Sequence, residues 1–249
     1  MTTKFNFFTQ REKMPDGYGY GQFSKTHILM LTIMCIFIVG ICLLYRYINI
    51  ENRSIIRCII AISLVCLELM KLAVIHFTHG KVSEYIPLEI CSFGSYSIII
   101  DAFLSPNAYI PEFLLVAFLP AAIIALIYPT TISLPALNFF TIHQFIFHAL
   151  IVAYALSRFI TGEIIFNYVG VWVSIISIFC IALFVYIIDI TCNRNFMFLK
   201  HDEGSSLLAT ISNISGGGHK YTLALVGISI MVIHIFYFIF KIIELIIIK

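Results

Sequence analysis

The sequence HILMLTIMCIFIVGICLLY occupies residues 27–45 and decides the fold class. It contains no Asp, Glu, Lys or Arg, and it is long enough to cross a hydrocarbon layer about 30 Å thick as one helix. Comparable apolar stretches recur near residues 55–76, 86–104, 110–128, 139–158, 168–189 and 221–241. Backbone amides inside lipid must bond within their own segment, and these stretches are too long for barrel strands. We therefore predict an all-α, polytopic integral membrane bundle with about seven transmembrane helices.

The composition of the whole chain agrees with this class. Of its 249 residues, 61% are hydrophobic and 11% are charged, whereas an average soluble domain is roughly 45–50% apolar and 25% charged. The polar tail, residues 1–26, has neither an apolar core nor a small-residue cleavage site, so we expect no cleaved signal peptide. The first span is then expected to direct insertion.

The connections between the spans indicate a single transmembrane domain over residues 1–249. Most connections are short, and the chain shows no internal repeat. The longest, residues 190–220, is rich in polar residues and glycine, which predicts a flexible loop. A turn around Ser105-Pro106-Asn107, followed by Pro111 and Pro120, predicts a kinked arm in the fourth span, with a re-entrant hairpin as the alternative.

The charges favour a cytoplasmic N-terminus, because about nine Lys and Arg fall on the tail side of the membrane and about six on the other. A net charge of +2 gives no reason to expect nucleic-acid binding.

The seven cysteines form no C-x-x-C pair, so neither a disulfide nor a zinc framework is predicted. His76, His79 and Glu84 lie near one membrane surface, but interfacial histidines are more common than metal sites. We expect no metal and no cofactor.

Four ionisable side chains lie at membrane depth, where each is a candidate for function. Glu68 and Lys71 are three residues apart on one helix and can neutralise each other. Asp101 lies close to the far end of its span, where it can reach interfacial water or cap a turn. His148 shares a stripe with Thr141 and Gln144, whereas His143 points elsewhere.

The third span opens with EYIPLEICSFGS at residues 84–95. Pro87 suits a helix start. At 100° per residue, Pro87, Cys91 and Ser95 share a stripe with Gly94 beside it, which gives a small, partly polar face. We therefore expect Cys91 to face something other than lipid.

Cys91, His148 and Glu68 fall in the same half of the membrane. A rise of 1.5 Å per residue places Cys91 about 6–8 Å deep, His148 about 15 Å and Glu68 about 12 Å. An imidazole can take the proton of a nearby thiol, and a carboxylate can orient that imidazole, which is the logic of Cys-His catalysis. The depths are compatible with one shared cavity.

Several motifs resemble those of a family of integral membrane proteins related to transmembrane protein 164 and the bacterial YwaF proteins. The matching pieces are Phe23-Ser24-x-x-His27, Glu68, Glu84-x-Ile-Pro-Leu-x-Ile-Cys91-Ser92, Phe145-Ile-Phe-His148 and Asn195-Phe-Met-Phe-Leu199. Their order and spacing agree over nearly the whole chain. Relatives often have His, Gly and Tyr where this chain has Glu89, Ala149 and Phe196.

The eukaryotic branch of that family is known for acyl transfer to lysophospholipids through a Cys and a His, so the resemblance implies these roles for Cys91 and His148. Our hypothesis is acyl transfer between membrane phospholipids and lysophospholipids through a Cys91 thioester, with His148 as general base and then acid, and Glu68 as the orienting carboxylate. Backbone amides or the hydroxyls of Ser92 or Ser95 are candidates for stabilising the oxyanion. Further supporting polar residues are Glu89, Gln144 and Asn195.

Three other readings use the same residues. A lipid hydrolase would use water as the acceptor. A small-molecule or ion transporter would line a pathway with Glu68, Lys71, Asp101 and His148. In a non-catalytic lipid-binding protein, Cys91 and His148 would only join helices through hydrogen bonds.

Overall fold

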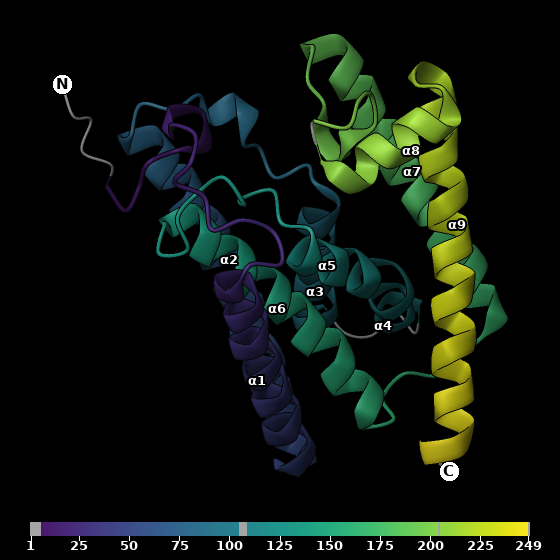
Figure 1. Cartoon of the computed structure of the whole chain (residues 1–249). Coiled ribbons are helices and arrows are strands. Elements are labelled where there is room, and N and C mark those ends of the chain that lie inside the picture. Colours follow the sequence, from purple (N-terminus) through teal and green to yellow (C-terminus); the bar gives the residue numbers. More distant parts are fainter. Residues whose placement is uncertain (1–5, 105–108, 204, 249) are drawn as a thin grey trace.

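The computed structural model describes residues 6–104, 109–203 and 205–248, without the side chains of residues 206, 247 and 248. Within these ranges the regular structure is helical throughout (Figure 1). Six of the described segments are long and apolar enough to cross a membrane: α1 (Lys25–Tyr47), α2 (Ile50–Phe77), the run Tyr109–Ile127, α6 (Phe139–Ile160), α7 (Tyr168–Cys192) and α9 (Gly218–Ile243). The apolar helix α3 (Ile90–Phe103) is shorter. The predicted all-α bundle of about seven helices is confirmed.

Helix α3 starts about one turn later than the apolar pattern predicts. Pro87 has no N–H, and the amide of Leu88 bonds the carbonyl of Ile86 at 2.7 Å in a tight turn. The backbone of Glu89 is extended, and helical geometry begins at Ile90. This delayed start brings Cys91 into the first turn of the helix.

The run Tyr109–Ile127 is continuous but irregular. It consists of α4 (Tyr109–Phe113), a π-helical turn η3 (Leu114–Phe118) and α5 (Leu119–Ile127). Pro120 has no N–H to bond the preceding turn, and a π-turn is one way in which a helix accommodates that loss. All five residues of η3 are buried, so the irregular turn lies in the core. The turn predicted around Ser105-Pro106-Asn107 lies outside the described residues.

Helix α6 occupies the centre of the bundle and contacts α1, α2, α3 and α5. Helix α9 packs against α7 and η3, and Figure 1 shows α7 and α9 side by side on the flank away from α1. The described part of the N-terminal tail and helix α8 (Ser206–Ser215) lie at the same end of the bundle, opposite the end of the chain. That end also holds the start of α3 and the end of α2.

The described residues of the connection, 190–203 and 205–220, contain helical segments that a flexible loop would lack. Helix α7 continues to Cys192, a short turn η4 (Phe196–Phe198) follows, and α8 precedes α9. The sequence Leu207-Leu208-Ala-Thr-Ile211 gives α8 an apolar side, although polar residues on both sides of it conceal this in the sequence. The flexible loop predicted from polarity alone is corrected accordingly.

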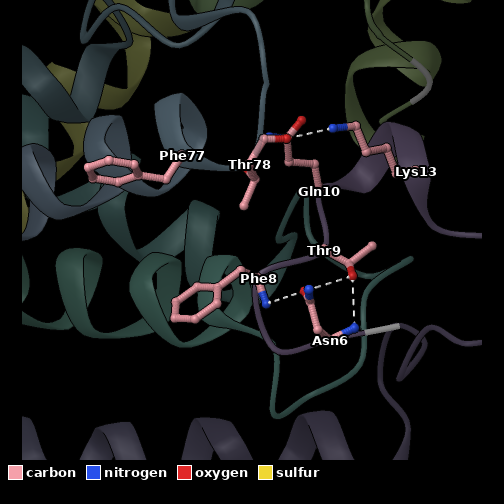
Figure 2. Close-up of a pocket in the computed structure, with 7 residues that line it drawn as sticks. All are labelled: Asn6, Phe8, Thr9, Gln10, Lys13, Phe77 and Thr78. Atoms are coloured by element: carbon pink, nitrogen blue, oxygen red, sulfur yellow. Dashed lines mark hydrogen bonds between the residues drawn. The ribbon is translucent and has the colours of Figure 1, made fainter. Parts of the chain in front are cut away.

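The N-terminal tail is fastened to the bundle, as Figure 2 shows at the end of α2. Gln10 Nε2 donates to Thr78 Oγ1 at 2.6 Å, and Lys13 Nζ, in the short turn η1 (Arg11–Lys13), donates to the Thr78 carbonyl at 2.8 Å. A cation bonded to a helix C-terminus complements the helix dipole. These residues line a hollow of about 320 Å³ together with Asn6, Phe8, Thr9 and Phe77. The hollow therefore lies where the tail attaches.

Candidate functional site

Cys91 lies in the first turn of α3 and is buried, with 6% of its surface exposed. The carbonyl of Glu89 accepts from the amides of Ser92 at 2.9 Å and Phe93 at 3.3 Å. In the described part of the chain, the amides of Ile90 and Cys91 have no hydrogen-bond acceptor, and the Glu89 side chain does not cap the helix. The thiol therefore stands beside the free N–H groups of a helix N-terminus.

The small face predicted around Cys91 is turned into the protein. Ser92, Gly94 and Ser95 are all buried, and a Cβ atom at Gly94 would lie 3.2 Å from the ring of Phe118 in η3. The Ser95 hydroxyl donates to the Ser92 carbonyl at 2.7 Å. Of the two hydroxyls considered for the oxyanion, that of Ser95 is thus already committed.

His148 lies on α6 and is half-buried. Its ring Nδ1 lies 2.6 Å from the backbone carbonyl of Gln144, one turn earlier. Donation from Nδ1 to that carbonyl would leave Nε2 as the acceptor of the neutral ring. The Gln144 side chain points elsewhere: its Oε1 accepts from Thr130 at 3.0 Å, and its Nε2 donates to the Ala125 carbonyl at 3.3 Å. Gln144 therefore supports His148 through its backbone.

The predicted pair on α2 is present, because Lys71 Nζ lies 2.7 Å from Glu68 Oε2. In the described residues no hydrogen bond joins Glu68 to the His148 ring. The hydrogen-bond partner of this ring in the described residues is the Gln144 carbonyl, and the orienting role of Glu68 stays a prediction.

The three helices that carry Glu68, Cys91 and His148 contact one another, since α2, α3 and α6 pack in every pairing. No hydrogen bond between the Cys91 thiol and the His148 ring exists among the described residues. The structure thus assembles the helices of the expected site and leaves the thiol and imidazole unbonded.

Residues 195–199, which follow α7, cover the start of α3, and we call them the covering segment. Glu89 Oε2 accepts a hydrogen bond from the amide of Met197 at 3.0 Å. Met197 and Phe198 have φ values of 56° and 57°, a left-handed geometry that non-glycine residues seldom adopt and that often marks functional segments. Phe196 and Leu199 are buried and pack together with Leu88 and Phe93.

Asn195 organises this covering segment. Its Nδ2 donates to the His201 carbonyl at 2.8 Å and to Glu203 Oε1 at 3.1 Å, and its Oδ1 accepts from the amide of Lys200 at 2.8 Å. Buried Asp189, at the end of α7, accepts from the amide of Phe196 at 2.8 Å. Sequence reasoning missed Asp189. The available signal was an acidic residue near the end of an apolar helix, just before Asn193-Arg194-Asn195.

A second set of hydrogen bonds joins the chain after α7 to the turn before α3 at the surface. Arg194 donates to Glu84 Oε1 at 3.0 Å and to Ser83 Oγ at 3.0 Å, in the turn η2 (Val82–Glu84). Burial would raise the pKa of Glu84, but the hydrogen bond from Arg194 and the charge of Lys81 outweigh it and lower that pKa. The two motifs that carry the family resemblance at Glu84–Ser92 and Asn195–Leu199 are therefore neighbours.

An apolar cavity of about 270 Å³ begins beside the start of α3. Its lining comes from α7, α9, the covering segment and Ile90, the residue before Cys91. Sequence periodicity did not reveal it, because α7 and α9 are apolar on nearly every side.

Asp101 is not at interfacial water. It is buried, forms an ion pair with Arg158 and accepts from the Tyr154 hydroxyl. Glu163 extends the cluster by accepting from Arg53, Arg57 and Arg158. The expectation that Asp101 reaches water is therefore corrected, since its partners come from α6 and lie at the end of the bundle away from Cys91.

The seven cysteines are free thiols. Within the ranges 6–104, 109–203 and 205–248, no three His, Cys, Asp or Glu side chains are arranged to hold a metal ion. His76, His79 and Glu84 thus form no such group.

The helices and the buried polar residues define an integral, multi-pass α-helical membrane protein. The chain belongs to the TMEM164 family, whose family model matches residues 22–240. No curated protein and no solved structure matches the chain. The matched range includes Glu68, Cys91, His148 and Asn195.

Proposed function

We propose that this protein transfers acyl chains between membrane phospholipids and lysophospholipids through a thioester on Cys91. The observation that carries the proposal is the position of Cys91: a buried thiol in the first turn of α3, beside two amides without acceptors. His148 lies on α6, which contacts α3, and Ile90, the residue before Cys91, lines an apolar cavity. The depths expected from the sequence put Cys91 and His148 in the same half of the membrane.

The helix N-terminus supports the nucleophile. The positive end of a helix dipole stabilises a negative charge that develops nearby, as it does on the sulfur and on the oxyanion during the reaction. His148 supplies the base once its Nε2 comes within hydrogen-bond reach of the thiol. Catalytic hydrogen bonds are often long without substrate and shorten in the complex.

The reaction has two balanced steps. In the first, the Cys91 thiol gives its proton to His148 and its sulfur attacks the ester carbonyl of the donor lipid; the C–S bond forms, the ester C–O bond breaks, and His148 returns the proton to the departing alkoxide. In the second, the acceptor hydroxyl gives its proton to His148 and attacks the thioester. The new C–O bond forms as the C–S bond breaks, and the thiolate recovers the proton.

The oxyanion in both steps needs donors that are in place before the reaction. The amides of Ile90 and Cys91 meet this requirement, because they are fixed by the helix and have no acceptor in the described residues. Ser92 remains a further candidate donor. Glu89 and Asn195 act on the site indirectly, by holding the covering segment over the start of α3.

The paired charges favour this reading over a transport pathway. Glu68 is paired with Lys71, and Asp101 with Arg158, so these carboxylates neutralise partners within the bundle. Transfer is favoured over hydrolysis because Cys91 is buried and the covering segment and the N-terminal tail lie at its end of the bundle. Exclusion of water protects a thioester from hydrolysis.

The test is lipid analysis of purified protein in vesicles that contain a lysophospholipid and a donor phospholipid with a labelled acyl chain. We expect Cys91→Ser and His148→Ala each to lower transfer at least about 100-fold, the range in which acid–base and nucleophile losses fall. Matched controls are Cys192→Ser, at an exposed thiol, and His234→Ala, at a histidine that is half-buried like His148 and whose Nδ1 makes the same contact one turn earlier at 2.8 Å. Equal transfer by all five proteins would refute the mechanism, and labelled free fatty acid as the main product would identify a hydrolase.

We further propose that the N-terminus is cytoplasmic, which the excess of Lys and Arg on the tail side supports. Thiol labelling from one side of the membrane tests this. We expect Cys192, exposed at the end of α7, to react with an impermeant maleimide only from the cytoplasmic face. Reaction from the opposite face alone would reverse the orientation.

A further inference from the structure

The cavity between α7 and α9 lies among the membrane-spanning helices and has a volume of about 270 Å³. Apolar side chains make up almost all of its wall: Ile90, Ile175, Ile176, Ile178, Phe179, Ala182, Met197, Leu199, Leu225, Val226, Ile230 and Ile233. Ser229 is the one hydroxyl-bearing residue in this lining. Its hydroxyl donates to the Leu225 carbonyl at 2.8 Å, so its bonding is satisfied within its own helix. The wall therefore offers a ligand hydrocarbon contacts.

One end of the cavity lies beside the start of α3. Ile90 lines the cavity and directly precedes Cys91. Met197 lines it as well, and the Met197 amide is bonded to Glu89, which directly precedes Ile90. Cys91 is not among the lining residues, so an acyl group on its sulfur would reach the cavity past Ile90.

The other end lies deeper in the bundle. From Ala182 back to Ile175 the wall runs along α7 for about 10 Å, at a rise of 1.5 Å per residue. Ile233, on α9, is buried and belongs to the same wall. The cavity is therefore elongated along the helices, as a hydrocarbon chain beginning at Cys91 would need.

The volume of the cavity restricts the kind of ligand that it can hold. Sites for drug-sized ligands usually have volumes of about 300–1,000 Å³, and this cavity, at about 270 Å³, is slightly smaller than that range. It suits one slender chain better than a whole phospholipid. In a membrane the helices are surrounded by the acyl chains of lipids. Such an acyl chain is therefore the most abundant apolar ligand, and it can enter between α7 and α9 without crossing water.

We infer that this cavity holds the acyl chain that Cys91 receives from its donor lipid, and that its depth selects the length of the chain transferred. This inference rests on the proposed acyl transfer. The small residues Ala182 and Ser229 leave the space open, and larger side chains there would shorten it.

The binding part is tested without transfer by using Cys91→Ser protein in phosphatidylcholine vesicles that carry a diazirine at the end of one acyl chain. After illumination, we expect the label to concentrate on the lining residues of α7 and α9, and the Ser229→Phe substitution to lower that labelling at least threefold. Met231→Phe is the matched control, because Met231 is exposed two residues further along α9. Labelling that is as strong on exposed residues outside the lining, such as Leu183 and Met231, as on the lining residues would overturn the inference, as would crosslinks from this face to a second copy of the chain.

The selection part is tested in the transfer assay with donor chains of different length. Ser229→Phe and Ala182→Phe are expected to reduce transfer of long chains at least tenfold relative to short ones, while Met231→Phe and Leu183→Phe leave the ratio unchanged; Leu183 is exposed beside Ala182. An unchanged ratio in the two cavity variants, with label still in the cavity, would mean that the cavity holds a lipid that is never transferred. Label in the cavity without any transfer by the wild type would instead refute the proposed function and leave chain binding standing.

Discussion

The carboxylate of Glu89 accepts the amide hydrogen of Met197 at 3.0 Å and joins two segments that are 108 positions apart in the chain. Glu89 directly precedes α3, and Met197 lies in the segment that covers it. Through this bond the segment after α7 is held against the start of the helix that carries Cys91.

Removing this bond should loosen the cover over Cys91. We expect Glu89→Ala to destabilise the attachment by about 1.5–3 kcal/mol, the usual contribution of a hydrogen bond to a charged group. In Glu89→Ala, hydrogen exchange at residues 195–199 should be at least tenfold faster than in the wild type, and the share of labelled donor that is hydrolysed should rise. Glu89→Gln keeps an acceptor oxygen, so each of these changes should be less than half as large in it. Exchange that is the same in Glu89→Ala as in the wild type would show that the bond does not hold the cover.

Variants of the pair Glu68–Lys71 can distinguish a structural role of Glu68 from a catalytic one. Lys71→Met leaves Glu68 buried without its partner, which should lower the thermal unfolding midpoint because an unpaired buried charge is costly. In the double variant Glu68→Gln/Lys71→Met both charges are gone, so we expect most of the stability and at least one third of the transfer rate to return. Loss of transfer at least 100-fold in the folded double variant would instead make Glu68 catalytic.

The ion pair of Asp101 and Arg158 should support the fold alone. Breaking a buried pair by removing one partner typically costs about 3–5 kcal/mol. Arg158→Met should therefore lower the unfolding midpoint strongly, and Asp101→Leu/Arg158→Met should recover much of it. The yield of folded protein and the unfolding midpoint in detergent provide the measurement; equal stability of Arg158→Met and wild type would contradict this reading of the cluster.

Gly170 is predicted to be intolerant of any side chain. A Cβ atom there would lie 1.9 Å from Oε2 of Glu112, which is fully buried. Gly170→Ala should cost about 1–3 kcal/mol through overpacking. Gly40→Ala is the matched control, because it sits within α1 with nothing within 4 Å of the new Cβ. A Gly170→Ala protein as stable as Gly40→Ala would show that Glu112 moves aside freely.

The sequence predicts the helices well because lipid leaves an apolar segment few alternatives to a helix. It also predicts the pair Glu68–Lys71, since residues three apart meet on one helix face. It does not predict the pair Asp101–Arg158, because that pair depends on how α3 and α6 are rotated against each other. The backbone carbonyl that holds His148 was missed for a different reason: every helix has such carbonyls, so the pattern of side chains carries no signal for it.

The position of the covering segment could not be predicted from the sequence either. Polarity predicted a flexible loop at residues 190–220, but the hydrogen bond from Phe196 to Asp189 and the burial of Phe196 and Leu199 hold residues 195–199 against the bundle. Such contacts depend on the distant segment at Leu88–Phe93, which no local pattern reveals. The resemblance to a known family identified both segments as motifs, and the structure supplies the physical reason that they belong together.

A thioester on Cys91 can be detected directly from the mass of the peptide that contains Cys91, after the protein is incubated with a donor phospholipid and quenched in acid. We expect an acyl group on this peptide that hydroxylamine removes, that is missing in Cys91→Ser, and that is passed on when a lysophospholipid is added. Transfer that proceeds at the wild-type rate with no acyl group on Cys91 at any time would contradict the thioester mechanism.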